Sequence, residues 1–175
     1  VDHSPIHFID FMPTFAGLAG ATYPGSFNGK PVVPLQGESF VPALEGKPFI
    51  GRDDFIYRDY IYGARDRWDE INDCSRSICD GKFNFIKNFM PQVPWDAHQA
   101  YLDFYRPAVH VMRRLKKEDK LDGKTGVFFK DRKPGVELYD WENDPEELNN
   151  LAVNPDNGEL LRRFEQLMDQ YLKDH

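Results

Sequence analysis

The chain has 175 residues, of which 41% are hydrophobic and 29% are charged. A domain of this length can bury about 70% of the surface of its unfolded chain, so the composition excludes disorder throughout. The 22 Lys and Arg against 29 Asp and Glu leave a net charge of −7. This acidic balance excludes a generally basic surface, and no apolar run reaches the roughly 18 residues of a membrane helix. We therefore expect neither nucleic acid nor membrane as a partner.

The first fifty residues predict one helix and little other regular structure. They begin without an initiator Met or a basic leader, so we expect this stretch to lie inside a longer protein. A short apolar strand end at 6–9 leads into a helix from Asp10, the expected N-cap, to Gly20. The Gly- and Pro-rich stretch 21–47 predicts an irregular connection around a short helix at 39–44. The apolar stripe of the first helix consists of Phe11, Met12, Phe15, Leu18 and Ala19.

The middle of the chain predicts strands. Residues 55–62 are rich in aromatic and β-branched side chains, which is typical of a covered strand. The polar residues 63–73 follow and are expected to form a loop. Asp80 and Gly81 lie between the segments 76–79 and 82–89, and this dipeptide predicts a β-hairpin closed by a two-residue type I′ turn.

The last third predicts helices around one short strand. Pro107 opens a helix that runs to about residue 119, and 138–140 form the strand. Asp144 and Glu147, three residues apart, have the form of a capping box. A single stripe at helical spacing marks the terminal helix: Leu160, Leu161, Phe164, Leu167, Met168, Tyr171 and Leu172. Strands followed by a terminal helix predict an α+β fold, a small antiparallel sheet with a packed C-terminal helix.

The two cysteines, Cys74 and Cys79, are too few for a disulfide scaffold or a four-cysteine zinc site. On one strand their odd spacing places them on opposite faces, so we expect buried free thiols. The acidic residues of 66–73 lack the spacing of a calcium loop, and the His residues lack that of a zinc protease. We therefore predict no metal site in this chain.

The charged segment 63–73 is the candidate site. Arg65 and Arg67, separated by Asp66, can bind a sulfate, phosphate or carboxylate bidentately. Trp68 offers a flat apolar face to a sugar or aryl group, and Glu70 adds a carboxylate. The alternative is a solvated loop with internal ion pairs. The basic run 113–117 is expected to be a solvated helix face.

Four short segments carry a recognisable pattern. Phe8–Gly20 contains hydrophobic-Ile-Asp-x-x-Pro-Thr, and Leu35–Leu44 contains Gly-x-Ser-Phe-x-Pro-x-Leu. Ile78–Ile86 has the form of a hairpin, and Glu137–Ala152 contains Glu-Leu-Tyr-Asp followed by Asp-Pro-x-Glu-x-x-Asn-Leu-Ala. In this order they resemble the C-terminal part of a sulfatase of the alkaline-phosphatase-like superfamily. The resemblance implies the trailing edge of an α/β catalytic domain with a wrapped linker at 1–50, and the sulfatase C-terminal subdomain at 51–175.

Within that family the pattern is most similar to the heparan N-sulfatase (sulfamidase) group. The similarity rests on the charged segment 63–70 and on the Pro-rich stretch 90–105. In that group the corresponding loop lies near the mouth of the substrate pocket. The resemblance therefore implies that four residues bind a sulfated saccharide: Arg65, Asp66, Arg67 and Glu70.

The resemblance also implies parts that this chain lacks. Sulfatases use a formylglycine, made from a Cys-x-Pro-x-Arg-type motif, and a Ca²⁺ ion, and Cys74–Ile78 is not that motif. Because the nucleophile and the metal ligands belong to the N-terminal domain of the family, we assign no catalytic residue and no bound cofactor here. We expect that missing domain as a partner and expect the isolated piece to be inactive. A periplasmic or extracellular location, lysosomal in a eukaryote, is implied in the same way.

Three hypotheses follow. The first is the C-terminal part of a sulfatase that hydrolyses sulfate esters or N-sulfo groups of sulfated sugars. The second is a free-standing module that binds anions or carbohydrates. The third is part of a related phosphate or phosphonate ester hydrolase, because C-terminal patterns discriminate poorly among hydrolases of one superfamily.

Overall fold

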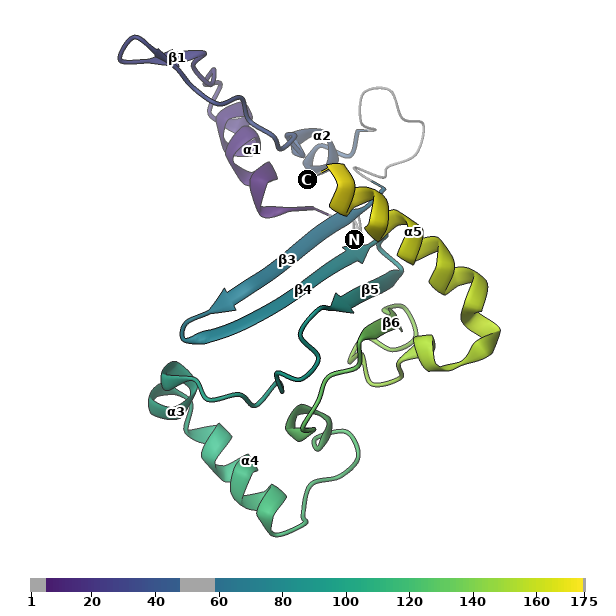
Figure 1. Ribbon diagram of the computed structural model, residues 1–175. Coiled ribbons are helices and arrows are strands. Elements are labelled where there is room, and N and C mark those ends of the chain that lie inside the picture. Colours follow the sequence, from purple (N-terminus) through teal and green to yellow (C-terminus); the bar gives the residue numbers. More distant parts are fainter. Residues whose placement is uncertain (1–5, 48–58, 175) are drawn as a thin grey trace. The chain divides into compact units, whose positions relative to one another are not determined.

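A computed structural model describes residues 6–47 and 59–174, which belong to two compact units that divide between Ile61 and Tyr62 (Figure 1). The predicted domain boundary at residue 50 lies outside the described residues. Unit 1, the N-terminal one, contains a 3₁₀ turn, two helices and a two-stranded ribbon. These are η1 (Phe8–Asp10), α1 (Phe11–Leu18), β1 (Ser26–Phe27), β2 (Lys30–Pro31) and α2 (Val41–Leu44).

Two buried polar side chains fasten the segment before α2 to the start of α1. The Asp10 carboxylate accepts the backbone N–H of His7 at 2.7 Å and that of Glu38 at 3.1 Å. The Thr14 hydroxyl accepts the backbone N–H of Phe40 at 3.0 Å. Asp10 thus precedes α1 as predicted, but it makes no side-chain cap bond to that helix. Its carboxylate instead joins two segments that are 28 residues apart in sequence.

A close backbone approach explains one glycine of the same contact. A Cβ atom built on Gly37 would lie 2.1 Å from the carbonyl oxygen of Ile9, which no side chain tolerates. Gly37 therefore allows the segment 35–44 to approach η1.

The apolar stripe predicted for α1 is largely uncovered in this chain. Met12, Phe15 and Leu18 are each more than half exposed. Within residues 6–47 no apolar side chain is buried, so hydrogen bonds and close backbone contacts, rather than a large apolar core, hold this part of unit 1 together.

Unit 2, the C-terminal one, has the predicted α+β architecture. Its four-stranded sheet has the order β3-β4-β5-β6, with the β4–β5 and β5–β6 pairs antiparallel. The strands are β3 (Ile61–Trp68), β4 (Ile71–Cys79), β5 (Phe83–Asn88) and β6 (Val136–Asp140). The helices are α3 (Ala100–Tyr105), α4 (Pro107–Lys117) and α5 (Gly158–Asp174), with 3₁₀ turns η2 (Val127–Phe129), η3 (Leu151–Val153) and η4 (Pro155–Asn157).

Helix α5 covers one face of this sheet and forms the core with it. The Phe164 ring stacks on Phe85 with their centroids 5.9 Å apart. Ile78 and Leu138 are register partners of Phe85 on the strands to either side, and both are fully buried. Met168, one turn after Phe164, is also fully buried. The stripe predicted for the terminal helix is thus confirmed as a packing face.

The predicted β4–β5 hairpin is present, but its turn differs from the prediction. The backbone N–H of Asp80 bonds the carbonyl of Phe83 at 3.2 Å, so Gly81 and Lys82 are the two central residues. Gly81 has φ of 90°. A glycine with positive φ at the first central position is typical of a type II′ turn, not of the predicted type I′. The Asp80 carboxylate accepts the backbone N–H groups of Lys82 and Phe83, and these two bonds stabilise the turn.

Three other expectations need correction or lie outside the described residues. Of the predicted strand 55–62, residues 55–58 are outside the described residues, and β3 begins at Ile61. The expected capping box at Asp144 is wrong, because no helix starts there. The Asp144 carboxylate accepts the N–H groups of Leu148 and Asn149 in a turn, and Glu147 instead accepts a bond from Asn84 Nδ2 at 2.6 Å. The predicted strand end at 6–9 is wrong: residues 6–7 have no regular structure, and 8–9 belong to η1.

Candidate functional site

The charged segment 63–73 is not the loop that the sequence predicted. It forms most of β3, a turn of Asp69 and Glu70, and the beginning of β4. Asp69 has φ of 51°, a conformation that Asp tolerates better than most residues. The reason for the difference is the position of β3 at the edge of the sheet. Charged side chains are common on edge strands because they discourage pairing with other chains.

The strand divides three of the four predicted site residues between its two faces, and the fourth, Glu70, lies in the turn. Successive side chains point to opposite faces, so Arg65 and Arg67 share one face and Asp66 lies on the other. Arg67 Nε donates to the carbonyl of Asp69 at 2.7 Å, within the turn. Asp66 accepts a bond from Arg76 Nη1 at 2.8 Å. This bond lowers the pKa of Asp66, which therefore stays ionised.

Arg65 lies beside a buried ion pair. Its Nε is 3.6 Å from the Asp73 carboxylate, which is also 2.5 Å from Lys133 Nζ. The side chains of Asp73 and Lys133 are 1% and 3% exposed, so water screens their attraction little. The Nε atom of Arg65 is buried, and no residue of the described ranges forms a hydrogen bond with it. The Asp73 carboxylate, 3.6 Å away, partly compensates this N–H through electrostatic attraction.

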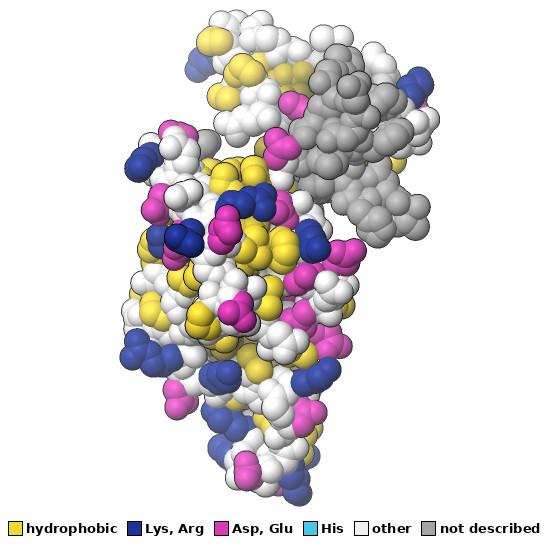
Figure 2. Space-filling view, turned by 90° about the vertical axis from the view of Figure 1, so that its right-hand side faces the viewer, with side chains coloured by type: hydrophobic (Ala, Val, Ile, Leu, Met, Phe, Trp, Pro, Cys, Tyr) yellow, Lys and Arg dark blue, Asp and Glu magenta, His cyan; other side chains and the backbone are white. Residues whose placement is uncertain are grey.

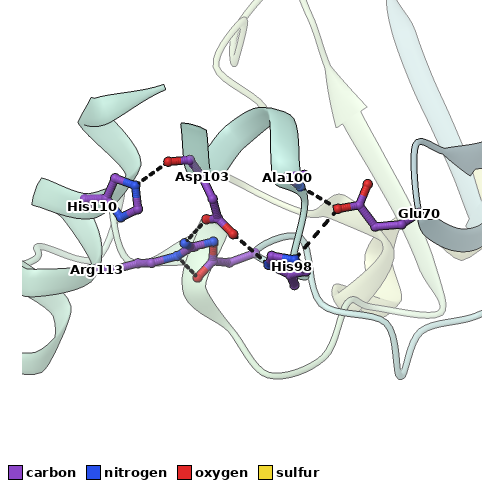
Figure 3. Close-up of polar contacts among 7 residues, drawn as sticks. Glu70, His98, Ala100, Asp103, His110 and Arg113 are labelled. Atoms are coloured by element: carbon purple, nitrogen blue, oxygen red, sulfur yellow. Dashed lines mark hydrogen bonds and ion pairs between the residues drawn. The ribbon is translucent and has the colours of Figure 1, made fainter. Parts of the chain in front are cut away.

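Glu70 connects the β3–β4 turn to the start of α3 (Figure 3). Its carboxylate accepts the backbone N–H of Ala100 at 2.5 Å and lies 3.8 Å from His98 Nε2. The bond from Ala100 holds the pKa of Glu70 below its ordinary value. In this structure Glu70 therefore acts on the position of α3, some distance along the hairpin from Arg65.

A second cluster of charges fixes α4 against the segment before it (Figure 3). Arg113 on α4 donates to both oxygens of Asp96 and to Asp103. Asp103 also lies 2.6 Å from His98 Nδ1, and its backbone carbonyl contacts His110 Nε2 at 2.6 Å. The bond from Arg113 lowers the pKa of Asp103. Arg113 is therefore a structural cation.

The basic run on α4 is only in part the solvated face that the sequence predicted. Arg113 is paired, and Lys116 Nζ donates to the carbonyl of Phe129 at 2.6 Å. Arg114 remains largely exposed. In the space-filling view, Lys and Arg side chains gather toward the end of the unit that carries α4 (Figure 2).

The face of the sheet opposite α5 is polar and buried, which the sequence analysis did not anticipate. Asn88 Nδ2 donates to Glu137 at 2.5 Å, and the Tyr139 hydroxyl donates to the other oxygen of Glu137. All three side chains are buried, and burial together with Glu137 raises the pKa of Tyr139. The alternation of Phe83 and Phe85 with polar neighbours on β5 was the available signal for this face.

The described residues contain neither a candidate metal site nor a helix that could span a membrane. Within 6–47 and 59–174, no group of three or more His, Cys, Asp and Glu residues could hold a metal ion. Within the same ranges, no helix combines the length and apolar character that crossing a bilayer requires. Cys74 and Cys79 are both free thiols, but the expectation that both are buried is wrong for Cys74, which is half-buried; only Cys79 is buried.

The curated proteins that this chain matches are sulfatases, the family that the four sequence segments resemble. The chain is 32% identical over 173 residues to an ulvan-active sulfatase of Formosa agariphila, a match that covers 98% of this chain and 26% of that protein. The chain is a homologue of sulfatases. It is also 27% identical to the human N-sulphoglucosamine sulphohydrolase, over 99% of this chain and 32% of that enzyme. No family model matches.

A solved structure supports the fold of this sulfatase homologue. A putative sulfatase from Bacteroides thetaiotaomicron superposes with a TM-score of 0.55 at 19% identity, over 94% of this chain and 24% of that one. The chain spans about a quarter to a third of the length of the curated relatives that it matches. It thus corresponds to a C-terminal sulfatase portion, as the resemblance implied.

Proposed function

We propose that this chain is the C-terminal part of an enzyme that hydrolyses sulfate esters or N-sulfo groups of sulfated sugars. The observation that carries the proposal is the identity of 32% to a sulfatase along 98% of the chain. The match to an N-sulphoglucosamine sulphohydrolase over 99% of the chain adds an N-sulfo group to the candidate substrates.

Within that enzyme, Arg65 and Arg67 would bind the sulfated saccharide. They lie on one face of an edge strand, and a guanidinium fork matches the geometry of a sulfate group. Asp66 and Glu70 would not contact the saccharide but would position neighbouring elements. Asp66 pairs with Arg76 across the hairpin, and Glu70 fixes the start of α3. The predicted set of four thus becomes two ligand-binding residues and two positioning residues.

The reactive groups would come from another part of the enzyme. A Ca²⁺ ion and a formylglycine would supply charge stabilisation and the nucleophile in the complete sulfatase. Residues 6–47 and 59–174 offer no group of acidic residues or His that fits a metal, and Cys74 does not stand in the family motif. We therefore assign this chain binding and positioning roles, with the N-terminal domain as its partner and a periplasmic, extracellular or lysosomal location.

The test is sulfate release by the complete protein that carries this chain. We expect sulfate from a sulfated oligosaccharide and expect none from the isolated 175 residues. Phenyl phosphate and phenyl phosphonate esters serve as competing substrates. Faster cleavage of either of them than of any sulfate ester or sulfamate would replace the proposal with a phosphate or phosphonate ester hydrolase.

A further inference from the structure

The ring of His98 lies between two carboxylates that belong to different elements (Figure 3). Its Nδ1 atom is 2.6 Å from the carboxylate of Asp103 on α3, and its Nε2 atom is 3.8 Å from the carboxylate of Glu70 in the β3–β4 turn. The side chain of His98 is 75% exposed, so it exchanges protons with solvent directly. The ring therefore bridges the tip of the hairpin and the start of α3.

Only the charged form of this ring can donate to both carboxylates. The N–H of Ala100 lowers the pKa of Glu70, and Arg113 lowers that of Asp103, so both groups stay ionised between about pH 5 and 8 and only accept hydrogen bonds. A neutral imidazole has one N–H, and if Nδ1 uses it for Asp103, a lone pair on Nε2 faces Glu70. An imidazolium has an N–H on each nitrogen. The charge of His98 therefore decides whether the ring attracts or repels the Glu70 carboxylate.

The other charged groups of this cluster do not replace that effect. Arg113 on α4 stays cationic and bonds Asp96 and Asp103 at any charge of His98. His110 on α4 contacts the backbone carbonyl of Asp103 at 2.6 Å, and an imidazole can supply the N–H for that bond whether it is neutral or charged. Within the cluster that Figure 3 shows, proton uptake thus adds a donor toward the β3–β4 turn at His98 alone.

We propose that His98 is a proton-dependent positioning residue, which fastens the β3–β4 turn to α3 when its ring is charged. Histidine ordinarily changes charge between about pH 5 and 8. Because the charged form has the additional partner, the contribution of His98 is present at the acid end of this range and is lost as pH rises. The turn should therefore be held more firmly near pH 5.5 than near pH 8.

The consequence for substrate rests on the proposed function. Arg67 Nε donates to the carbonyl of Asp69 in the same turn, so a firmly held turn also holds one of the two guanidinium groups assigned to the saccharide. In the complete protein, proton uptake by His98 would therefore favour the binding conformation of β3. The coupling between His98 and the turn is itself independent of any substrate.

The measurement is hydrogen exchange at the amide of Ala100, followed by NMR on the 175-residue chain at about pH 5.5 and pH 8 and corrected for the intrinsic rate. This N–H donates to the same oxygen of Glu70 that His98 faces, so its protection reports how firmly the carboxylate is held. His98→Gln removes the titrating ring. His110→Gln is the matched control, because it removes an exposed imidazole of the same cluster and retains a side-chain N–H for the Asp103 carbonyl.

In the wild type and in His110→Gln we expect protection at Ala100 to be about two- to fivefold greater at pH 5.5 than at pH 8, the range of an exposed ion pair. In His98→Gln, protection should be equal at both pH values and close to that of the wild type at pH 8. The amide of Phe85, which is fully buried in the sheet, should keep its protection throughout and so establishes that each variant is folded.

The wild-type comparison requires no variant and is decisive by itself: equal protection of Ala100 at both pH values would overturn the inference. A wild-type pH response in folded His98→Gln, or its loss in His110→Gln, would overturn it as well. None of these measurements depends on sulfate release, so this inference and the proposed function fail separately.

Discussion

The buried pair of Asp73 and Lys133 gives the sharpest test of the packing of unit 2. The two side chains are 1% and 3% exposed, with 2.5 Å between carboxylate and ammonium. Asp73→Asn would leave the Lys133 charge uncompensated in the interior, at a cost of about 3–5 kcal/mol in the free energy of unfolding. Glu146→Gln is the matched control, because Glu146 and Lys124 form an ion pair that is 68% and 70% exposed. Loss of such an exposed pair costs less than about 1 kcal/mol.

The assay is urea unfolding followed by tryptophan fluorescence. All three tryptophans lie between residues 62 and 175, so the signal reports unit 2 alone. With a denaturant slope of about 2 kcal/mol per molar, Asp73→Asn should lower the midpoint by roughly 1.5–2.5 M and Glu146→Gln by less than about 0.5 M. Replacing both buried partners, Asp73→Leu with Lys133→Met, should recover much of the loss. Equal small shifts for Asp73→Asn and Glu146→Gln would refute the reasoning.

Three further predictions concern the core, the turn and the thiols. Phe164→Ala, at a fully buried position, should lower the free energy of unfolding by about 3–5 kcal/mol in the same urea assay. The N–H of Ala100 lowers the pKa of Glu70, so the stability that this bond contributes is complete above the ordinary carboxyl pKa. That stability is lost as pH falls through the lowered pKa. Hydrogen exchange at the amide of Ala100 should therefore accelerate, beyond the intrinsic trend, as pH falls through this lowered pKa on the acid side of 4.5, in wild type but not in Glu70→Gln. Burial raises the pKa of the Cys79 thiol, so iodoacetamide at pH 8 should modify Cys74 first, as peptide mass spectrometry would determine.

Elements with a clear hydrophobic period could be predicted from the sequence. The α5 stripe repeats every three to four residues over three turns, and Phe164 and Met168 from it are fully buried. Likewise, β6 and the β4–β5 hairpin follow from short strand-forming runs beside a turn dipeptide. These elements are fixed by local pattern together with one buried face.

Elements that depend on tertiary contacts could not be predicted. Residues 61–68 form a strand although Arg65, Asp66 and Arg67 are charged, because β3 pairs with β4 at the sheet edge. The short ribbon of β1 and β2, by contrast, could have been predicted: it turns at Asn28 and Gly29, with φ of 51° and 76°, and this dipeptide is a local hairpin signal that the sequence analysis missed.

The sequence predicted which residues make up the candidate site but not how they are arranged. Arg65 and Arg67 share a face, but their neighbour Asp66 pairs on the other one. Arg65 forms its ion pair with Asp73. Asp73 is in turn bonded by Lys133, which lies 60 residues after it in the sequence. Contacts of that range leave no periodic trace in a single sequence.

The most direct test of the account is the kinetics of the complete protein that carries this chain, with Arg65 and Arg67 both changed to Gln. If the two guanidinium groups bind the sulfated saccharide, kcat/KM for a sulfated oligosaccharide should fall at least tenfold through a higher KM, while kcat/KM for a small aryl sulfate stays within about twofold. Arg114→Gln, at an exposed position on α4, is the control and should leave both values unchanged. Wild-type kinetics of the double variant toward the oligosaccharide would contradict the assignment of these two residues.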